Sequence, residues 1–310
     1  MCVQATTTTK RREHAALWRV GELGNLEVLH ATFVTQSFPR HTHDTFAIGM
    51  NVHGTKVYAY AGTTCYVPAG GIIVTNPGEV HAGHAADDQG CTYQTAYPDV
   101  ALLQQIVSEV VGRVKSAPAF SQPIIHDPAL FRLLRDLHRS FAEPEAALEC
   151  QSRLVWTYAQ LLTRHAAERP IPPPLGREHH AVRWIRDYLA AHLAENVTLD
   201  QLAQVTDLSA FHLLRVFRAA VGLPPHAYLT QLRIAHAKRR LAEGQRVAQV
   251  AAESGFVDQS HLTKHFKRLV GVTPGQYAAA VMAASRFELL GHQADEVGRD
   301  PGAGRSKNNS

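Results

Sequence analysis

The chain has 310 residues, of which 45% are hydrophobic and 19% are charged, and its formal net charge is +4. This length predicts about two domains, and the apolar content is sufficient for a packed core, which excludes global disorder and a fibrous architecture. The excess positive charge lies in the C-terminal part, because residues 177–290 hold 14 Lys and Arg against 9 Asp and Glu, whereas the rest holds 17 against 18.

Residues 1–99 are predicted to form a β-barrel of the cupin or jelly-roll type, of which the first ~20 residues are a flexible arm. Five short segments are rich in β-branched and aromatic residues and are separated by Gly, Pro, Asn or Asp. They are 26–34, 45–53, 56–61, 71–76 and 91–97. Strands at such close spacing are typical of a barrel or a sandwich.

Residues 100–168 are predicted to form a helical connector. Apolar residues recur at helical spacing over 102–114, 130–141 and 154–162. The first or second of these stripes is expected to mediate dimerisation, although covering the barrel is an equally good use for either. Residues 169–176 (RPIPPPLG) hold four prolines, which predict a stiff linker.

Residues 177–287 are predicted to form an all-α domain with an internal repeat, followed by a disordered polar tail at 288–310. Residues 202–228 align with residues 250–277, and each copy has the pattern of a helix-turn-helix. The aligned pairs are Ala203 with Ala251, His212 with His261, Leu213 with Leu262, Phe217 with Phe266, Gly222 with Gly271, Pro225 with Pro274 and Tyr228 with Tyr277.

The turns and helix starts of the two copies also correspond. Asp207 is expected to hold the first turn and Ser209 to cap the helix after it, while Gly255 and Asp258 do the same in the second copy. Residues 225–243 predict a connecting helix about 28 Å long. Such a helix would place the two motifs near successive major-groove segments, about 34 Å apart on duplex DNA.

Residues 255–274 (GFVDQSHLTKHFKRLVGVTP), Arg233, Ile234 and Ala237 of the connecting helix, and the Gly-x-x-Pro-x-x-Tyr that ends each copy resemble the AraC/XylS family of bacterial transcription regulators. The resemblance covers about residues 181–280 and implies binding to double-stranded DNA. It implies that base edges or nearby phosphates are contacted by Phe211, Leu214 and Arg215 in the first copy and by Gln259, Ser260, Thr263 and Lys264 in the second. Arg218, Lys267 and Arg268 are expected to anchor phosphates.

A second motif lies in the predicted barrel. His41 and His43 form a His-x-His on an expected strand, which would place both rings on one face, and His81 follows a Pro-Gly turn. This arrangement resembles the cupin fold and the cupin-type sensor domain that precedes the DNA-binding region in many AraC-type regulators. By resemblance to sugar-responsive members, Arg40, Tyr93 and Thr95 lie near an effector pocket.

Three uses of these histidines stay open. Neutral imidazoles suit a divalent ion such as Zn, Fe or Ni, but the carboxylate that cupin enzymes typically add is missing, since residues 45–48 (TFAI) fill its expected positions. Alternatively, His41 and His43 are hydrogen-bonded residues of the core or rim, or an organic effector is held by hydrogen bonds in the barrel mouth.

The sequence lacks the common catalytic motifs, which gives an enzyme no positive support. No nucleophile elbow or phosphate loop is found, and Gly70-Gly71 lacks dinucleotide-binding spacing. No stretch is apolar enough for a membrane helix, residues 1–10 lack the apolar core of a secretory signal, and the cysteines form no C-x-x-C pair. We therefore expect a cytoplasmic protein with reduced thiols and without a membrane partner.

The predicted function is effector-controlled transcription regulation. The expected partners are double-stranded DNA, a small-molecule effector, RNA polymerase and a second copy of the chain, and no cofactor is expected apart from the divalent metal left open above. The alternatives are a metal-dependent cupin enzyme, such as a dioxygenase or isomerase, with a helical appendage, and a DNA-binding protein whose barrel is purely structural.

Overall fold

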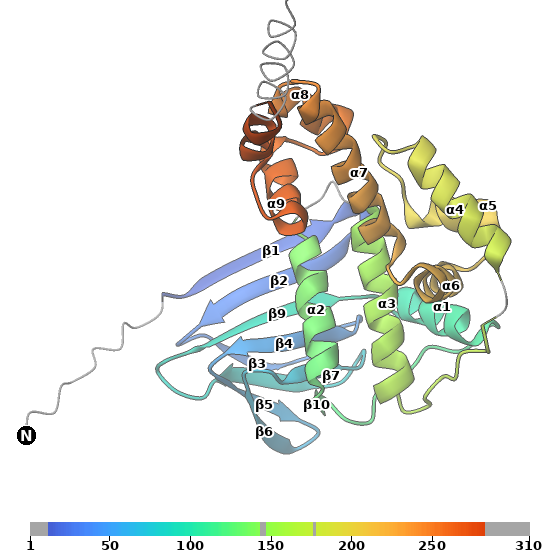
Figure 1. Cartoon of the computed structure of the whole chain (residues 1–310). Coiled ribbons are helices and arrows are strands. Elements are labelled where there is room, and N and C mark those ends of the chain that lie inside the picture. The colour runs from blue at the N-terminus through green and yellow to red at the C-terminus, as the bar shows by residue number, and fades with distance from the viewer. Residues whose placement is uncertain (1–11, 143–146, 176–177, 283–310) are drawn as a thin grey trace, which may run out of the picture. The chain divides into compact units, whose positions relative to one another are not determined.

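The computed structural model describes residues 12–142, 147–175 and 178–282 (Figure 1). These residues divide into two compact units. The first unit contains residues 12–188 and 196–227, and the second contains residues 189–195 and 228–282. The predicted tail at 288–310 lies outside the described residues. Within them, no helix is both long and apolar enough to cross a lipid bilayer.

The first unit is built on two antiparallel sheets. In the described part of the chain, one sheet has six strands in the order β1-β2-β9-β4-β7-β10, and the other has four in the order β3-β8-β5-β6. The strands are β1 (His14–Val20), β2 (Leu26–Phe33), β3 (Ser37–His41), β4 (Ala47–His53), β5 (Thr55–Tyr60), β6 (Thr63–Pro68), β7 (Ile72–Thr75), β8 (His81–Ala85), β9 (Cys91–Tyr97) and β10 (Ile124–Ile125). The predicted strand-rich N-terminal domain is confirmed.

The central strands of the six-stranded sheet are largely buried, and the alternation of side chains along each strand decides which face each residue occupies. In β4, Ile48 belongs to the main hydrophobic core, whereas its neighbours Ala47 and Gly49 line a cavity. This cavity is the candidate effector site described below.

Three helices complete the main core, as the helical periodicity predicts. They are α1 (Val100–Val111), α2 (Pro128–Ser140) and α3 (Ala147–His165). Figure 1 shows α2 and α3 crossing the six-stranded sheet. Their apolar stripes, including Leu103, Leu134 and Tyr158, are fully buried in the same cluster as the strand residues. The stripes of α1 and α2 therefore cover the sheet, and the use of either in dimerisation stays a prediction.

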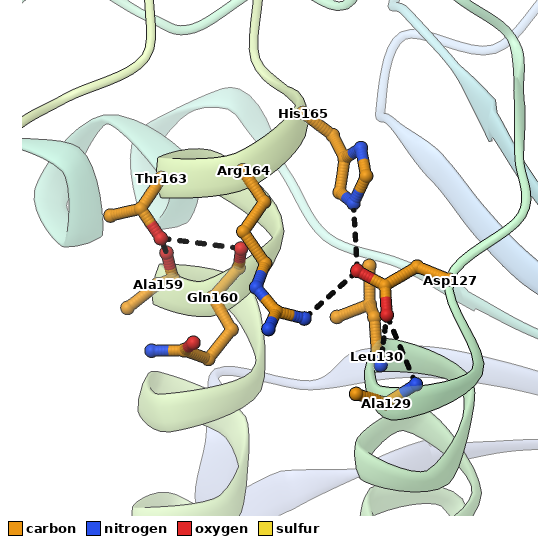
Figure 2. A network of polar contacts seen from close by, with 8 residues as sticks. All are labelled: Asp127, Ala129, Leu130, Ala159, Gln160, Thr163, Arg164 and His165. Carbon is orange, nitrogen blue, oxygen red and sulfur yellow. Dashed lines mark hydrogen bonds and ion pairs between the residues drawn. The ribbon is translucent and has the colours of Figure 1, made fainter.

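One aspartate ties the start of α2 to the end of α3 (Figure 2). Asp127 Oδ1 accepts hydrogen bonds from the amides of Ala129 and Leu130, and Oδ2 lies 2.8 Å from Arg164 Nη1 and 3.0 Å from His165 Nε2. Burial opposes ionisation of this carboxyl group, but the hydrogen bond from His165, the two amides and the charge of Arg164 together lower its pKa. Asp127 therefore stays ionised and fixes the two helices together.

The predicted flexible arm is wrong for residues 14–20. This segment is β1, which pairs along its whole length with β2, from His14 opposite Thr32 to Val20 opposite Leu26. Trp18 packs edge-on against His30 with ring centroids 4.7 Å apart, and Val20 is buried. Pairing with β2, whose alternate side chains are buried, holds this segment in the sheet.

A buried pair of histidines joins the sheet to α2. His30 Nε2 of β2 lies 3.0 Å from His138 Nδ1, so one imidazole N–H donates to the unprotonated nitrogen of the other. His138 is fully buried, and desolvation together with the neighbouring His30 lowers its pKa from 6.5 to about 3. A charged His138 would therefore be strongly unfavourable in the folded chain.

We expect the folded chain to lose stability on mild acidification because of His138. Between pH 6.5 and about 3 the unfolded chain binds a proton at this position that the folded chain excludes, so each pH unit lowers the free energy of unfolding by up to about 1.4 kcal/mol. Urea unfolding at pH 7 and pH 5 measures this slope. His138→Leu should reduce it, whereas the exposed His84→Leu should retain it, and equal slopes in all three proteins would contradict the assignment.

The C-terminal half of the described chain is helical, as predicted. Its helices are α4 (His179–Ala191), α5 (Leu199–Thr206), α6 (Ala210–Val221), α7 (Pro225–Ala242), α8 (Val247–Glu253) and α9 (Gln259–Val270). Helices α5 and α6 form the first helix-turn-helix, and α8 and α9 form the second. The spacing of the two motifs on DNA stays a prediction.

The turns and caps of both motifs match the sequence analysis. Asp207 and Gly255 have left-handed backbone angles, with φ of 52° and 72°. Ser209 Oγ accepts from the amide of His212 at 3.2 Å, and Asp258 Oδ1 accepts from the amide of His261 at 2.7 Å. The paired core residues are fully buried, namely Leu213, Phe217, Leu262 and Phe266.

Candidate effector pocket and nucleic-acid interface

A cavity of the first unit lies between the two sheets and has a volume of about 110 Å³. Most of its polar lining comes from inward-facing residues of β5, β8 and β9 and from the end of β3. These residues are His41, His43, Lys56, Tyr58, Thr75, His81, Tyr93, Thr95 and Tyr97. Among the described residues that line it, none carries a carboxylate.

The three histidines of the sequence motif meet at this cavity. Their ring centroids lie 4.3 Å apart for His41 and His81, 4.9 Å for His41 and His43, and 5.0 Å for His43 and His81. Burial is the main cause that lowers the pKa of both His43 and His81 below 6.5. These two imidazoles are therefore neutral at neutral pH.

One expectation about this motif is wrong in detail. Strand β3 ends at His41, and His43 lies in the following loop, so the two rings do not share a face by strand alternation. The loop nevertheless returns the His43 ring to the cavity, where it packs against Tyr97 with centroids 5.2 Å apart. His81, the first residue of β8, pairs with His41 across the two strands.

Lys56 provides the positive charge in the cavity lining. Its Nζ lies 3.7 Å from the ring centroid of Tyr93, and burial lowers its pKa to about 8. Gly83 on the adjacent strand makes room for this side chain, because a Cβ there would lie 3.1 Å from Lys56 Cε. A half-buried lysine without a carboxylate in the lining favours an anionic ligand.

The tyrosines of the cavity are neutral hydrogen-bonding groups. Burial raises the pKa of Tyr58 and of Tyr97 to about 12 and raises that of Tyr93 as well. Tyr58 Oη shares a hydrogen bond of 2.8 Å with Thr75 Oγ1. The cavity thus combines neutral donors and acceptors with one cation.

The structure brings together five of the six predicted effector-binding residues. His41, His43, His81, Tyr93 and Thr95 line the cavity. Contrary to expectation, Arg40 is exposed and lies outside the lining, within the register shift of β3 between Phe38 and His41. Sequence reasoning missed Lys56, Tyr58 and Tyr97. Their alternation along strands 56–61 and 91–97 was a usable signal, but it did not show which face is internal.

Helix α9 presents its predicted DNA-contacting residues at the surface. Gln259, Ser260, Lys264, Lys267 and Arg268 are exposed, and Thr263 is half-buried. The opposite side of the helix holds Leu262 and Phe266, which are buried in the core of the second unit. This division between a core side and a polar side is the one that a recognition helix requires.

Helix α6 differs from α9, because within the first unit it packs on α1 and α3, which are called the sensor helices below. Phe211 and Leu214 are only 3% and 2% exposed, which contradicts the expectation that they face DNA in this conformation. The Phe211 ring stacks on Trp156 of α3 with centroids 6.1 Å apart. The backbone amide of Phe211 donates to Glu109 Oε2 of α1 at 3.1 Å.

Further contacts support the same docking. Arg218 is exposed but lies over the Trp156 ring at 4.9 Å from its centroid, and Arg215 Nη1 donates to the Pro173 carbonyl at 2.9 Å. The amide of Leu199, at the start of α5, donates to Gln151 Oε1 of α3 at 2.8 Å. The first helix-turn-helix therefore belongs to the same compact unit as the barrel, beyond the boundary predicted at 169–176.

Comparison with known proteins agrees with the two types of domain. The model of the AraC-like ligand binding domain matches residues 23–157, and the model of a helix-turn-helix domain matches residues 202–280. The uncharacterized HTH-type transcriptional regulator YbfI of Bacillus subtilis is 32% identical over 240 residues, which cover 77% of this chain and 86% of YbfI. The chain belongs to the AraC family of transcriptional regulators.

Two further proteins are also similar to this chain. The HTH-type transcriptional activator RhaS of Escherichia coli is 23% identical over 246 residues, covering 76% of this chain and 86% of RhaS. The crystal structure of the DNA-binding domain of AdpA in complex with a target DNA is 30% identical, covers 34% of this chain and 95% of its own, and has a TM-score of 0.33. The present chain, as an AraC-family regulator, has an N-terminal ligand-binding domain and a C-terminal helix-turn-helix DNA-binding domain.

Proposed function

We propose that this AraC-family regulator is switched by a small anionic effector, which binds in the cavity and releases the first helix-turn-helix from the sensor helices. The observation that carries the proposal is the docking of α6 on α1 and α3, which buries Phe211 and Leu214. Two side chains that the family resemblance assigns to DNA contact are inaccessible in this conformation. The docked conformation is therefore the one with low affinity for DNA.

The contact at the start of α6 occupies a position that also suits a DNA phosphate. The N-terminus of a helix attracts anions, because its free amides and its dipole favour negative charge. Glu109 places a carboxylate at this position, where its Oε2 accepts a hydrogen bond from the amide of Phe211. A DNA phosphate at the same helix end would compete with Glu109, so docking and DNA binding by α6 are alternatives.

A direct path connects the cavity to the docking surface. Tyr93, Thr95 and Tyr97 line the cavity from β9, and α1 begins three residues after this strand, with Asp99 as its cap. A ligand that moves these side chains acts on the start of the helix that carries Glu109. We propose that this short connection transmits effector binding to α6.

The decisive experiment is an operator-binding titration of the full chain. A labelled duplex selected by the protein from a random library is titrated with and without small carboxylic acids, sugars and amino acids, and fluorescence anisotropy is recorded. We expect at least one carboxylic acid to raise operator affinity and also to raise the melting temperature of the protein. If ligands stabilise the protein but leave its operator affinity unchanged, the switch is refuted.

Two substitutions on α9 test its role as a recognition helix. Lys264→Ala is expected to weaken specific operator binding by about 1–3 kcal/mol if Lys264 contacts a base, whereas Lys267→Ala should mainly reduce the salt dependence of binding by about one counterion. Anisotropy titrations at several salt concentrations distinguish the two effects. Lys115→Ala, outside the DNA-binding domain, is the control, and variants indistinguishable from it would remove these residues from the interface.

The remaining partners follow from the proposed role. A regulator of this kind acts in the cytoplasm on chromosomal DNA, binds as a homodimer and contacts RNA polymerase. Its relatives are transcriptional regulators, and we propose no catalytic activity. Sedimentation of the purified chain tests the dimer directly.

A further inference from the structure

We propose that His41, His43 and His81 hold a divalent transition-metal ion, and that a small carboxylate ligand completes its coordination beside Lys56. This inference deepens the proposed function, since the carboxylate would be the effector. It depends on the arrangement of the three side chains, on the hydrogen bonds that orient them and on the lining of the cavity around them.

The three histidines meet the spatial requirement for a common ion. One ring nitrogen from each of them can be chosen so that all three lie within 4.8 Å of one another. His41 and His81 come from paired strands, and His43 comes from the loop that follows β3. Small rotations of these side chains would bring three nitrogens to the distance of about 2.0–2.1 Å at which zinc binds imidazole.

Backbone carbonyls orient two of the rings in the manner of metal ligands. His41 Nδ1 lies 2.7 Å from the carbonyl of Pro39, and His81 Nδ1 lies 3.0 Å from the carbonyl of Glu79. A carbonyl accepts only, so Nδ1 of each ring carries the proton and donates it. Nε2 is then unprotonated, and its lone pair is available to a metal, as in metal sites whose histidines donate their other N–H to a carbonyl.

The carboxylate of Glu79, two residues before His81, is committed elsewhere, which leaves coordination positions for a ligand. Glu79 Oε2 accepts hydrogen bonds from Tyr60 Oη, from the amide of Asn76 at 3.2 Å and from Asn76 Nδ2 at 3.0 Å. No described residue that lines the cavity adds a carboxylate. Three protein ligands with open positions are typical of metal sites that also bind an exogenous molecule.

Charge and volume define the class of this molecule. Lys56 contributes a cation to the lining, and Tyr58 and Thr75 contribute hydroxyl groups. A carboxylate oxygen could therefore bind the metal while the ligand's negative charge is balanced by Lys56. The volume of about 110 Å³ corresponds to about four water molecules at ~30 Å³ each, which limits the ligand to the size of a 2-oxo or 2-hydroxy acid such as pyruvate or lactate.

Metal binding is tested on the full chain without DNA. The protein is stripped with a chelator and titrated with Zn²⁺ or Ni²⁺ in a competition assay, and Co²⁺ is used to record a visible absorption spectrum. We expect one ion per chain, a tetrahedral or five-coordinate Co²⁺ spectrum, and at least a hundredfold loss of affinity in His41→Ala and in His81→Ala. Absence of stoichiometric binding in the wild-type chain overturns the proposal.

Matched variants exclude a general effect on folding. His84→Ala changes an exposed histidine on the same strand as His81 and should bind the metal like the wild type. Each variant is compared by circular dichroism in the metal-free form. If His41→Ala or His81→Ala is unfolded, His43→Gln provides the third position, and an unchanged affinity in any folded variant of the three rejects that histidine as a ligand.

The carboxylate is tested on the metal-loaded protein with pyruvate, lactate and oxalate as probes. We expect them to change the Co²⁺ spectrum and to bind at least tenfold more weakly to Lys56→Met, which retains the length of the side chain. Unchanged spectra would overturn the ligand assignment. Metal binding without any effect on operator affinity would refute the proposed switch and leave the metal site intact. An operator response to the carboxylate in metal-free protein would support the switch and refute the metal as part of the effector site.

Discussion

Arg233→Ala is expected to lower the local stability of the second unit by about 3 kcal/mol. The Arg233 side chain of α7 donates from Nε to the carbonyl of Leu193 at 2.9 Å and from Nη2 to that of Glu195 at 2.8 Å. Its removal leaves two carbonyls without their charged donor, and hydrogen bonds to charged groups contribute about 1.5–3 kcal/mol each. The effect should appear as an approximately hundredfold loss of hydrogen-exchange protection in α7, α8 and α9.

The surroundings of Arg233 show that the site is specific for a guanidinium. Burial lowers its pKa to about 10, which leaves it charged at neutral pH, and a Cβ on Gly255 would lie 3.0 Å from its Cζ. Arg233→Lys keeps the charge but cannot donate to both carbonyls in the same geometry, so about half of the loss should remain. Arg239→Ala on the same helix is exposed and serves as the control. If both alanine variants exchange alike, the two hydrogen bonds contribute nothing measurable.

The combined variant Glu109→Ala and Trp156→Ala is expected to bind its operator about ten- to a hundredfold more tightly than the wild type in the absence of effector. The first change removes the carboxylate that accepts from the Phe211 amide, and the second removes the ring on which Phe211 stacks. Aromatic pairs contribute about 0.5–1.5 kcal/mol and charged hydrogen bonds about 1.5–3 kcal/mol. Weakening the docked conformation by this amount should shift the population toward free α6.

The same variant should lose most of its response to the effector. Arg113→Ala, on an exposed residue just after α1, is the control for a change near this surface, and melting curves confirm that the variant is folded. Fluorescence anisotropy with the selected operator measures both affinities. Wild-type affinity combined with a normal effector response in the double variant would show that docking of α6 does not control DNA binding.

Local sequence determines most of the helix-turn-helix architecture. Ser209 and Asp258 cap their helices, and Asp207 and Gly255 adopt the left-handed conformation that their turns require. Each of these features depends on contacts within a few residues along the chain, so side-chain spacing predicts them well. The three helices after the barrel are equally predictable, because their apolar stripes repeat every three to four residues.

The sheets are less predictable from the chain alone. Strands β3, β6 and β8 are short or rich in His, Gly and Thr, and only their pairing with neighbouring strands defines them. Alternation along β5 separates Lys56 and Tyr58 from Val57, but the arrangement of the two sheets decides which set lines the cavity. The three histidines are brought together by the same arrangement and not by their spacing in the sequence.

The burial of α6 is the clearest example of a feature decided by tertiary structure. Its sequence closely parallels that of α9, and both helices have a buried apolar side formed by Leu213 and Phe217 or by Leu262 and Phe266. Nothing local distinguishes Phe211 as a DNA contact from Phe211 as a core residue. A side chain is buried or accessible according to the surface that packs against it, and Trp156, which stacks on Phe211, lies 55 positions earlier in the chain.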